Sequence, residues 1–366
     1  MITGLKTFMN SKKSSVHNMA QLTHKEKEVL YGLIRFPDLN DIELAQRIRI
    51  KRPTITAIRN RFEKEGLYSM KRIPDLRQLG CELITATYTQ YNPLTSYETR
   101  KKDIKENPTT FIEIQTDSQQ LTLSAAKNYT EAKKHLNQHI RVNEKLGYSK
   151  KKNITSLFFP LELSIVLMNC AFGPLVRKNF SLDAGDDTDE VPSQRRGSVE
   201  LTDHERLVLY ALVKYPMLRE KEIAEKTLLT RQTVNSINRK LKSEGVIKTV
   251  RIPDFRKLGL ELVIFTSIFM RPTVPLEERM KVASKVVNEG SQVFIVSNLT
   301  ESVMVSFSKS YTDVQKTYRE LLELYSRHNF LERRPKLRIM PVDEIKCLKC
   351  DYAEVTRHLL KIEAVI

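Results

Sequence analysis

Apolar residues recur at helical spacing between residues 22 and 62, and the pattern returns between residues 201 and 241. Gly66 is expected to end the last helix of the first stretch, because glycine adopts the left-handed conformation of a helix end without steric cost. The segment from there to Leu79 suits a small hairpin with Pro74-Asp75 at its turn. Three short helices and a hairpin predict a winged helix-turn-helix domain. The apolar positions of the three helices are Val29, Leu30, Leu33 and Ile34; Leu44, Ala45 and Ile48; Ile55, Ile58 and Phe62.

A different periodicity follows Gly80 in the first half of the chain and Gly259 in the second half. The predicted order there is strand, helix, strand, strand, helix, strand, which is the ferredoxin-like βαββαβ unit. The fold class is therefore α+β, with two copies of a winged helix-turn-helix plus a ferredoxin-like βαββαβ regulatory domain. In the second half these elements are expected at Glu261–Met270, Leu276–Asn288, Gln292–Ser297, Val303–Ser308, Thr312–Tyr325 and Lys336–Met340. In the first half, strands are expected near Leu83–Thr89, Thr110–Ile114, Leu121–Ala125 and Thr155–Phe159.

The two halves are related by an internal repeat with a constant offset of 179 residues. The sequence RIPD at residues 72–75 returns at 251–254, and VLY at residues 29–31 returns at 208–210. Such a repeat predicts two copies of one fold. The expected organisation is a disordered basic tail at 1–20, a winged-helix domain at 21–80, a ferredoxin-like domain at 81–180, a linker at 181–200, and a second pair of domains at 201–259 and 260–366.

The chain carries 61 Lys and Arg residues against 44 Asp and Glu residues, a formal net charge of +17. This excess favours a polyanionic partner such as a nucleic acid, while a merely soluble basic surface is the alternative. No apolar run approaches the roughly 18 residues that a membrane helix needs, and residues 1–20 lack a secretory signal. Four cysteines do not make a disulfide framework, so we expect reduced thiols and a cytoplasmic protein.

The third helix of the second half has the composition that a DNA major groove demands. Val234, Ile237 and Leu241 form an apolar stripe that anchors the helix to its own domain, and no acid occurs before Glu244. Guanidinium and amide groups pair with base edges, whereas hydroxyl and ammonium groups bind phosphates. A solvated basic helix face is the alternative. The candidate DNA-binding residues are Arg231, Gln232, Thr233, Asn235, Ser236, Arg239 and Lys240.

The equivalent helix of the first half repeats the apolar stripe and has Pro53 in its first turn, where a missing amide hydrogen costs little. The two helices have similar frames but different exposed residues, which predicts two related but unequal DNA half-sites. The candidates in the first helix are Arg52, Thr54, Thr56, Ala57, Arg59, Asn60 and Arg61.

Basic residues also follow the third helix of each half, which we call the recognition helix. They lie in the segment predicted to be a hairpin. They suit phosphate contacts beside the groove, which position a protein without reading the sequence, and a solvated loop is the alternative. These residues are Lys71, Arg72 and Arg77 in the first half, and Lys248, Arg251, Arg256 and Lys257 in the second half.

The run LTDHERLVLYALVKYPMLREKEIAEKTLLTRQTVNSINRKLKSEGVIKTVRIPDFRKLG at residues 201–259, followed by the βαββαβ unit, resembles the leucine-responsive (Lrp/AsnC) transcription regulators. The resemblance covers nearly the whole chain as two tandem copies. It implies a prokaryotic regulator that binds double-stranded DNA and has regulatory domains that dimerise through their sheets. It also implies a small-molecule effector, no cofactor and no enzymatic activity. A fused pair of copies would be a covalent pseudo-dimer, able to form a homodimer as well, that engages two half-sites about one helical turn apart.

The chain departs from this family in the turn between the second and third regulatory strands. Members that respond to amino acids tend to carry Gly and Asp there, but the turn reads SNLTE at residues 297–301 and QTDSQ at residues 115–119. An amino-acid effector is therefore not expected.

Two other functions fit the same architecture. Siroheme decarboxylases resemble it, and they would need a tetrapyrrole pocket with His or Arg groups. A non-specific architectural protein would bind all DNA duplexes with equal affinity. The sequence contains no nucleophile elbow, glycine-rich phosphate loop or HExxH motif.

Two small groups of residues are candidates for redox or metal chemistry. Cys347 and Cys350 form a C-x-x-C motif, which can make a redox disulfide or half of a metal site, with ordinary thiols as the alternative. His135 and His139 lie one helical turn apart, with Glu131 one turn earlier, so they could share a metal. A solvated helix face is the alternative for these three residues.

Overall fold

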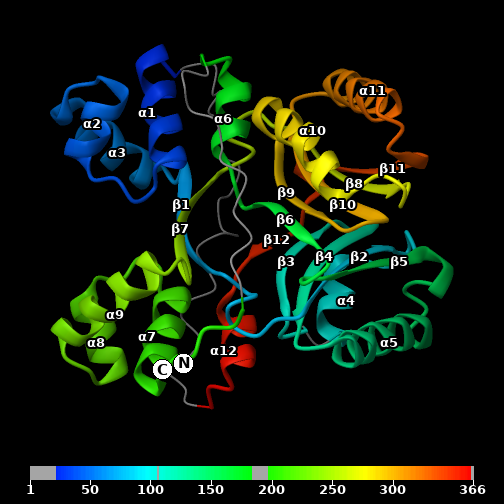
Figure 1. Ribbon diagram of the computed structural model, residues 1–366, viewed down its shortest axis with the longest axis horizontal. Coiled ribbons are helices and arrows are strands. Elements are labelled where there is room, and N and C mark those ends of the chain that lie inside the picture. Colours follow the sequence, from blue (N-terminus) through cyan, green and yellow to red (C-terminus); the bar gives the residue numbers. More distant parts are fainter. Residues whose placement is uncertain (1–21, 105–106, 184–196, 364–366) are drawn as a thin grey trace.

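The computed structural model describes residues 22–104, 107–183 and 197–363 (Figure 1). The predicted tail at 1–20 and most of the predicted linker at 181–200 lie outside these residues. The elements of the first half are α1 (His24–Arg35), α2 (Asp41–Ile48), α3 (Arg52–Glu65), β1 (Tyr68–Pro74), β2 (Leu83–Gln90), α4 (Tyr97–Asp103), β3 (Thr110–Gln115), β4 (Gln119–Ala126), α5 (Tyr129–Lys145), β5 (Ile154–Pro160), β6 (Ile165–Asn169) and α6 (Gly173–Phe180).

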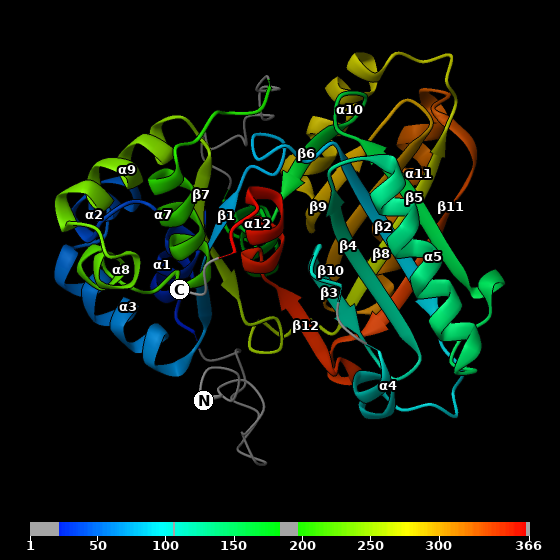
Figure 2. The same ribbon diagram turned by 90° about the horizontal axis from the view of Figure 1, so that it is seen from below.

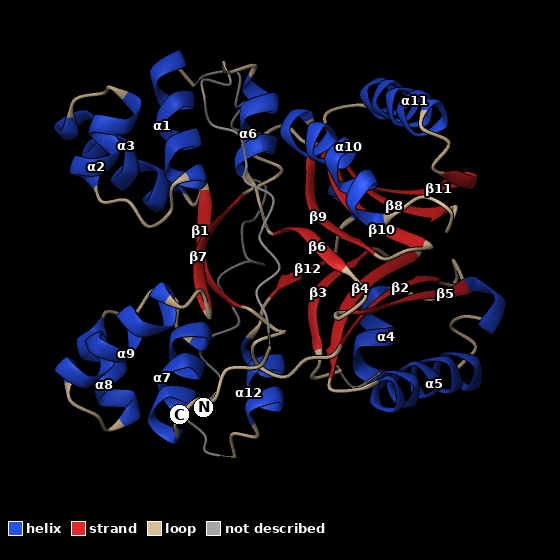
Figure 3. Cartoon of the chain, in the orientation of Figure 1, coloured by secondary structure: helices blue, strands red, loops and turns tan. Residues whose placement is uncertain are grey.

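The second half repeats this order of elements. They are α7 (Asp203–Lys214), α8 (Glu220–Thr227), α9 (Arg231–Ser243), β7 (Ile247–Pro253), β8 (Leu262–Met270), α10 (Leu276–Glu289), β9 (Gln292–Ser297), β10 (Glu301–Ser308), α11 (Tyr311–Arg327), β11 (Leu331–Pro341), β12 (Cys347–Cys350) and α12 (Ala353–Leu360). The predicted α+β class, with three helices before each βαββαβ unit, is confirmed (Figure 3). None of the helices in the described part of the chain is long and apolar enough to cross a membrane.

Local sequence signals explain the three-helix units. The first helix of each unit begins with a capping box, in which Thr23 and Glu26, or Thr202 and Glu205, satisfy each other's backbone amides. Gly66 ends α3 in the left-handed region at φ 63°, as its position predicted.

The predicted hairpin after each recognition helix is wrong. In place of a hairpin, β1 of the first half pairs with β7 of the second half in an antiparallel ribbon, with Lys71 opposite Val250 (Figure 1). The Pro74-Asp75 pair marks the end of the strand, where the Asp75 amide donates to the carbonyl of Val246 at 2.8 Å. A proline with an aspartate ends a strand as readily as it makes a turn, because proline cannot donate to the ladder.

Two five-stranded sheets lie beyond this ribbon, and each includes one strand contributed by the other half of the chain. Their strand orders are β12-β3-β4-β2-β5 and β11-β8-β10-β9-β6. The contributed strands are β12, which pairs with β3, and β6, which pairs with β9. The last segment of each half therefore crosses to the sheet of the other half. It then leads back into a helix of its own half, α6 after β6 and α12 after β12. Helix α6 contacts α1, and α12 contacts α7.

The inner faces of the two sheets pack against each other, and helices cover their outer faces (Figures 1 and 2). Tyr88 of β2 stacks on Phe265 of β8 with ring centroids 6.2 Å apart, and the Arg338 guanidinium lies 4.3 Å from the Tyr88 ring. Helices α4 and α5 cover one sheet, and α10 and α11 cover the other. The helix-turn-helix units thus lie at one end of the molecule and the sheets at the other.

Candidate nucleic-acid interface and internal cavity

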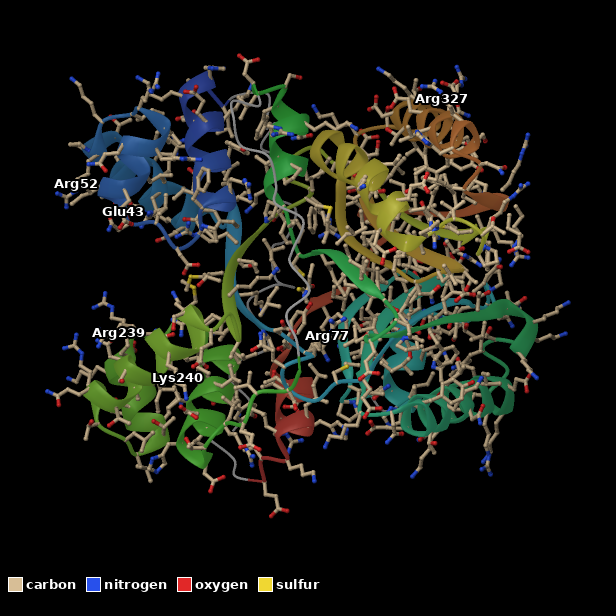
Figure 4. All side chains as sticks on the ribbon, in the orientation of Figure 1. Glu43, Arg52, Arg77, Arg239, Lys240 and Arg327 are labelled. Atoms are coloured by element: carbon tan, nitrogen blue, oxygen red, sulfur yellow. The ribbon has the colours of Figure 1, made fainter. Side chains whose placement is uncertain are left out.

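Both recognition helices are free of the regulatory sheets. Helix α3 packs on α1, α2 and β1, while α9 packs on α7, α8 and β7. Ile55 and Phe62 anchor α3, and Val234 and Leu241 anchor α9, all four with no exposed surface. Both helices lie at the end of the molecule opposite the sheets, where Figure 4 labels Arg52, Arg239 and Lys240.

Most of the predicted DNA-binding side chains on these helices reach solvent. Thr54, Thr56, Arg59 and Thr233 are half-buried. The exposed residues are Arg52, Ala57, Asn60 and Arg61 on α3, and Arg231, Gln232, Asn235, Ser236, Arg239 and Lys240 on α9.

Carboxylates of the same units hold several of these basic groups. On α3, Arg59 lies 2.6 Å from Asp41, which also accepts a 2.6 Å hydrogen bond from Thr56. Arg61 lies 2.7 Å from Glu26. On α9, Lys240 lies 2.6 Å from Glu205, and its hydrogen bond lowers the pKa of that carboxyl. These contacts fix the recognition helices, so DNA would compete with carboxylates for these side chains.

The prediction that Arg251 contacts phosphates is wrong, because the ribbon buries it between the two helix-turn-helix units. Arg251 is 7% exposed and donates a 2.6 Å hydrogen bond to the carbonyl of Leu33. On the same ribbon, Lys71 and Arg72 are half-buried, and Lys248 donates to the carbonyl of Asn169 at 2.7 Å.

The other basic residues of the predicted hairpins contact backbone carbonyls. Arg77, near the centre of Figure 4, donates to the carbonyls of Leu161 and Ser164 beside the first sheet. Arg256 donates at 3.2 Å and 3.1 Å to the carbonyls of Val342 and Ile345. These two arginines therefore join the helix-turn-helix units to the regulatory sheets.

The first regulatory half contains a cavity of about 510 Å³ between its sheet and helices α4 and α5. This volume lies in the range of small-molecule binding sites. Its floor is the outer face of the sheet, which presents the hydroxyl groups of Thr85, Thr87, Thr110, Thr122 and Ser124. His135 and His139 of α5 form part of the opposite wall.

Among the described residues of the second half, the hollow on the corresponding face measures about 20 Å³ and is lined mainly by apolar side chains, together with Arg279, Ser297 and Ser302. The strand registers identify equivalent positions: Thr87 pairs with Thr122, which pairs with Glu113. In the second sheet Thr266 pairs with Met304, which pairs with Ile295. Thr122 and Glu113 thus stand where the second half has methionine and isoleucine. Helix α4 has 7 residues and α10 has 14, so the first sheet is also less covered.

Burial favours the neutral form of the two cavity histidines. Burial lowers the pKa of His139 to about 4, and burial also lowers the pKa of His135. A hydrogen bond of 3.0 Å joins the His139 ring and the Thr89 hydroxyl. The His135 ring lies 3.4 Å from the Thr109 hydroxyl. A neutral imidazole offers one donor and one acceptor, which suits hydrogen bonding to an uncharged polar ligand.

Glu131 does not join these histidines in a metal site. Its carboxylate lies 2.6 Å from the His358 ring nitrogen of α12, a hydrogen-bonding contact between the two halves. No group of three or more His, Cys, Asp or Glu residues in the described ranges is arranged to hold a metal ion. The possible metal site of Glu131, His135 and His139 is therefore not found among the described residues.

We expect the stability of the protein to fall between pH 7 and pH 5 because of His139. Its folded pKa lies below its unfolded value of about 6.5, so the unfolded chain binds the additional proton as the pH falls, and stability is lost in this window. The loss should be about 1–2 kcal/mol. Urea denaturation at both pH values should show a smaller difference in the His139→Gln variant, which keeps a hydrogen-bonding side chain but does not titrate. An unchanged difference would contradict the assignment.

The two cysteine side chains of the C-x-x-C motif point to opposite faces of the strand β12 that contains them. Residues three apart in a strand face opposite sides. Cys347 lines the cavity, whereas Cys350 faces Cys170 of the first half with the two Sγ atoms 3.6 Å apart. Tyr352 lies beside them and donates a 2.8 Å hydrogen bond to Asn169. The two cysteines of the motif, candidates for a redox or metal pair, therefore do not face each other, and Cys350 lies beside Cys170 instead.

Mild oxidation with diamide is expected to link Cys170 to Cys350, with the two thiols losing two protons and two electrons to the diazene. The 3.6 Å separation needs only a small movement to reach disulfide bonding distance. Peptide mapping without reductant should find this crosslink in the Cys347→Ser variant and lose it in the Cys170→Ser variant. A Cys347–Cys350 disulfide as the main product would contradict the geometry.

The fold and these sites define a protein with paired helix-turn-helix units joined to ferredoxin-like sheets, and solved structures share that architecture. The siroheme decarboxylase NirDL matches with a TM-score of 0.49 and 11% identity, over 92% of this chain and 97% of that chain. An AsnC family transcriptional regulator from Agrobacterium tumefaciens matches 38% of this chain and 90% of its own, with a TM-score of 0.32 and 16% identity. LrpC of B. subtilis matches 39% of this chain and 95% of its own, with a TM-score of 0.31 and 19% identity.

These likenesses concern the fold alone, and they correct one expectation. No protein-family model matches the chain, and no curated protein matches it. The expectation that the chain has no enzymatic activity is contradicted, because siroheme decarboxylase NirDL, an enzyme, matches 92% of this chain, although at 11% identity.

Proposed function

We propose that this chain is a sequence-specific double-stranded DNA-binding transcription regulator made of two tandem Lrp/AsnC-like copies. Its two recognition helices read two related half-sites as a covalent pseudo-dimer. The observation that carries the proposal is that α3 and α9 both present exposed basic and amide side chains on the end of the molecule away from the sheets. Arg52, Arg231 and Arg239, three of the exposed arginines on these helices, are assigned to phosphates or base edges.

The ribbon supports this proposal by fixing one recognition helix relative to the other. Lys242 of α9 lies 2.6 Å from Asp38 of the first half, which also accepts a hydrogen bond from Thr249. Contacts between the units reduce the freedom that DNA binding would otherwise have to remove.

Selection of binding sites from a random duplex pool, at one fixed salt concentration, tests the proposal. We expect an enriched sequence with two unequal half-sites about one helical turn apart, and a footprint of one chain that covers both. Equal affinity for all duplexes would indicate a non-specific architectural protein. A footprint of a single half-site per chain would contradict the pseudo-dimer.

An enzyme of the same architecture is the second candidate function, because the cavity has the volume of a small-molecule site and two histidines in its wall. A siroheme-decarboxylase-like activity requires a tetrapyrrole to enter the hollow beside His135 and His139. The absorption spectrum tests this function. A porphyrin band in the purified protein, or a shifted band when an iron-uroporphyrin III analogue is added, would favour it.

A further inference from the structure

We infer that the cavity of the first half is a binding site for an uncharged small molecule with several hydroxyl groups, such as a sugar, a polyol or a nucleoside. The cavity and the chemistry of its lining carry this inference. It does not rest on DNA binding, because the site lies on the outer face of a regulatory sheet.

The floor of the cavity is a lattice of hydroxyl groups. Thr110 and Ser124 lie 2.9 Å apart across neighbouring strands, and Thr87 lies 2.9 Å from Ser156. Each hydroxyl can donate one hydrogen bond and accept two, so a hydroxyl pair retains capacity for a ligand. Strands about 4.8 Å apart repeat these groups at a spacing that the hydroxyls of a sugar or polyol can follow.

The charges around the cavity balance and are largely engaged. Arg100 is buried, and its guanidinium donates to the carbonyls of Thr95, Thr116 and Asp117 at 2.7–2.9 Å. The Glu113 carboxylate accepts a 2.7 Å hydrogen bond from Gln120. Among the described lining residues, the other two charged groups are Lys101, which is exposed, and Asp103, which accepts from the Tyr148 hydroxyl.

A phosphate or a polycarboxylate would need a cluster of available cations, since a buried anion is costly without partners. Among the described lining residues the cations are Arg100 and Lys101, with the two carboxylates as counterweights. Neutral imidazoles complete the wall. This lining fits a neutral, hydrogen-bonding ligand.

The fold itself does not require a polar lining here. On the same sheet face the second half carries Ile268, Ile295 and Met304, all nearly fully buried in an apolar cluster. Polar groups beneath a helix layer reduce stability unless a partner satisfies them, whereas apolar groups in the same place add to it. The difference between the halves therefore indicates a binding function kept in one copy.

Thermal unfolding of the full chain, with defined compounds added, tests the inference. The neutral probes are D-glucose, myo-inositol, D-ribose and adenosine, and the charged probes are ribose 5-phosphate, L-leucine and an iron-uroporphyrin III analogue. We expect at least one neutral probe at millimolar concentration to raise the Tm by about 2 °C or more, because a ligand that binds the native state shifts unfolding. No shift with any neutral probe, or a shift with charged probes alone, would overturn the inference.

Filling the cavity should remove this effect. Thr122→Met introduces the side chain that the second half carries at Met304, and Thr130→Met makes the same change at an exposed position of α5. We expect T122M to lose the ligand-induced shift and T130M to keep it. If T122M does not fold, Thr85→Ile takes its place, since the second half carries Ile264 at the equivalent position. A shift retained in the filled variant would refute the site, whatever the outcome of the DNA experiments.

Discussion

Replacing both Arg231 and Arg239 by alanine is expected to weaken binding to the selected DNA site by about 2–6 kcal/mol. An arginine that contacts a base or a phosphate contributes about 1–3 kcal/mol, and both side chains are exposed on α9. Fluorescence anisotropy at fixed salt should measure the loss. Repeating the titration over a range of salt concentrations separates the two kinds of contact, because each lost phosphate contact lowers the salt slope by about 1.

The matched control removes two arginines from the opposite end of the molecule. Arg319 and Arg327 are exposed on α11, which covers the second regulatory sheet. Figure 4 labels Arg327. The R319A/R327A variant has the same net charge as R231A/R239A but keeps both recognition helices. We expect it to bind DNA nearly as well as the unmodified protein. If the two variants lose the same affinity, α9 does not form the DNA-binding surface.

Local patterns predicted most of the elements, because helix and strand periodicities depend on neighbouring residues. The second-half strand predicted at Gln292–Ser297 is observed with those bounds. What the patterns missed was pairing between the halves. The partner of β1 lies about 180 residues away, and nothing in residues 68–74 distinguishes a distant partner from a hairpin arm. Strands β6 and β12 were missed for the same reason, since they complete sheets of the opposite half.

The sequence contained one indication of the cavity, a row of threonines in a strand, which hydrophobic periodicity alone could not identify as internal. Thr85, Thr87 and Thr89 alternate with apolar residues in a strand whose outer face helices must cover. The internal repeat shows that this row of threonines is particular to the first half. The aligned positions of the second half hold Ile264, Thr266 and Ile268. Alternation alone is typical of a strand with one solvated face. Only the helices above that face make its hydroxyls internal.

The ribbon contains a pair of equivalent arginines that differ in one hydrogen bond. Arg251 donates to the carbonyl of Leu33, in the last turn of α1. The residue four positions further on is Pro37, which has no amide hydrogen to offer that carbonyl. Arg72 has the equivalent place in β1, but its Nη1 is buried without a hydrogen-bond partner among the described residues.

Arg251→Met is therefore expected to lower the free energy of unfolding by about 2–4 kcal/mol. The substitution leaves the Leu33 carbonyl buried and unpaired, and it removes a cation that lies 5.6 Å from the centre of the Tyr68 ring. Arg72→Met removes a buried donor that has no partner, so it should cost less than about 1 kcal/mol or even stabilise the protein. Guanidinium denaturation of both variants beside the unmodified protein measures the difference. Equal losses would mean that side-chain volume in the ribbon, and not the hydrogen bond to α1, determines the contribution of these arginines to stability.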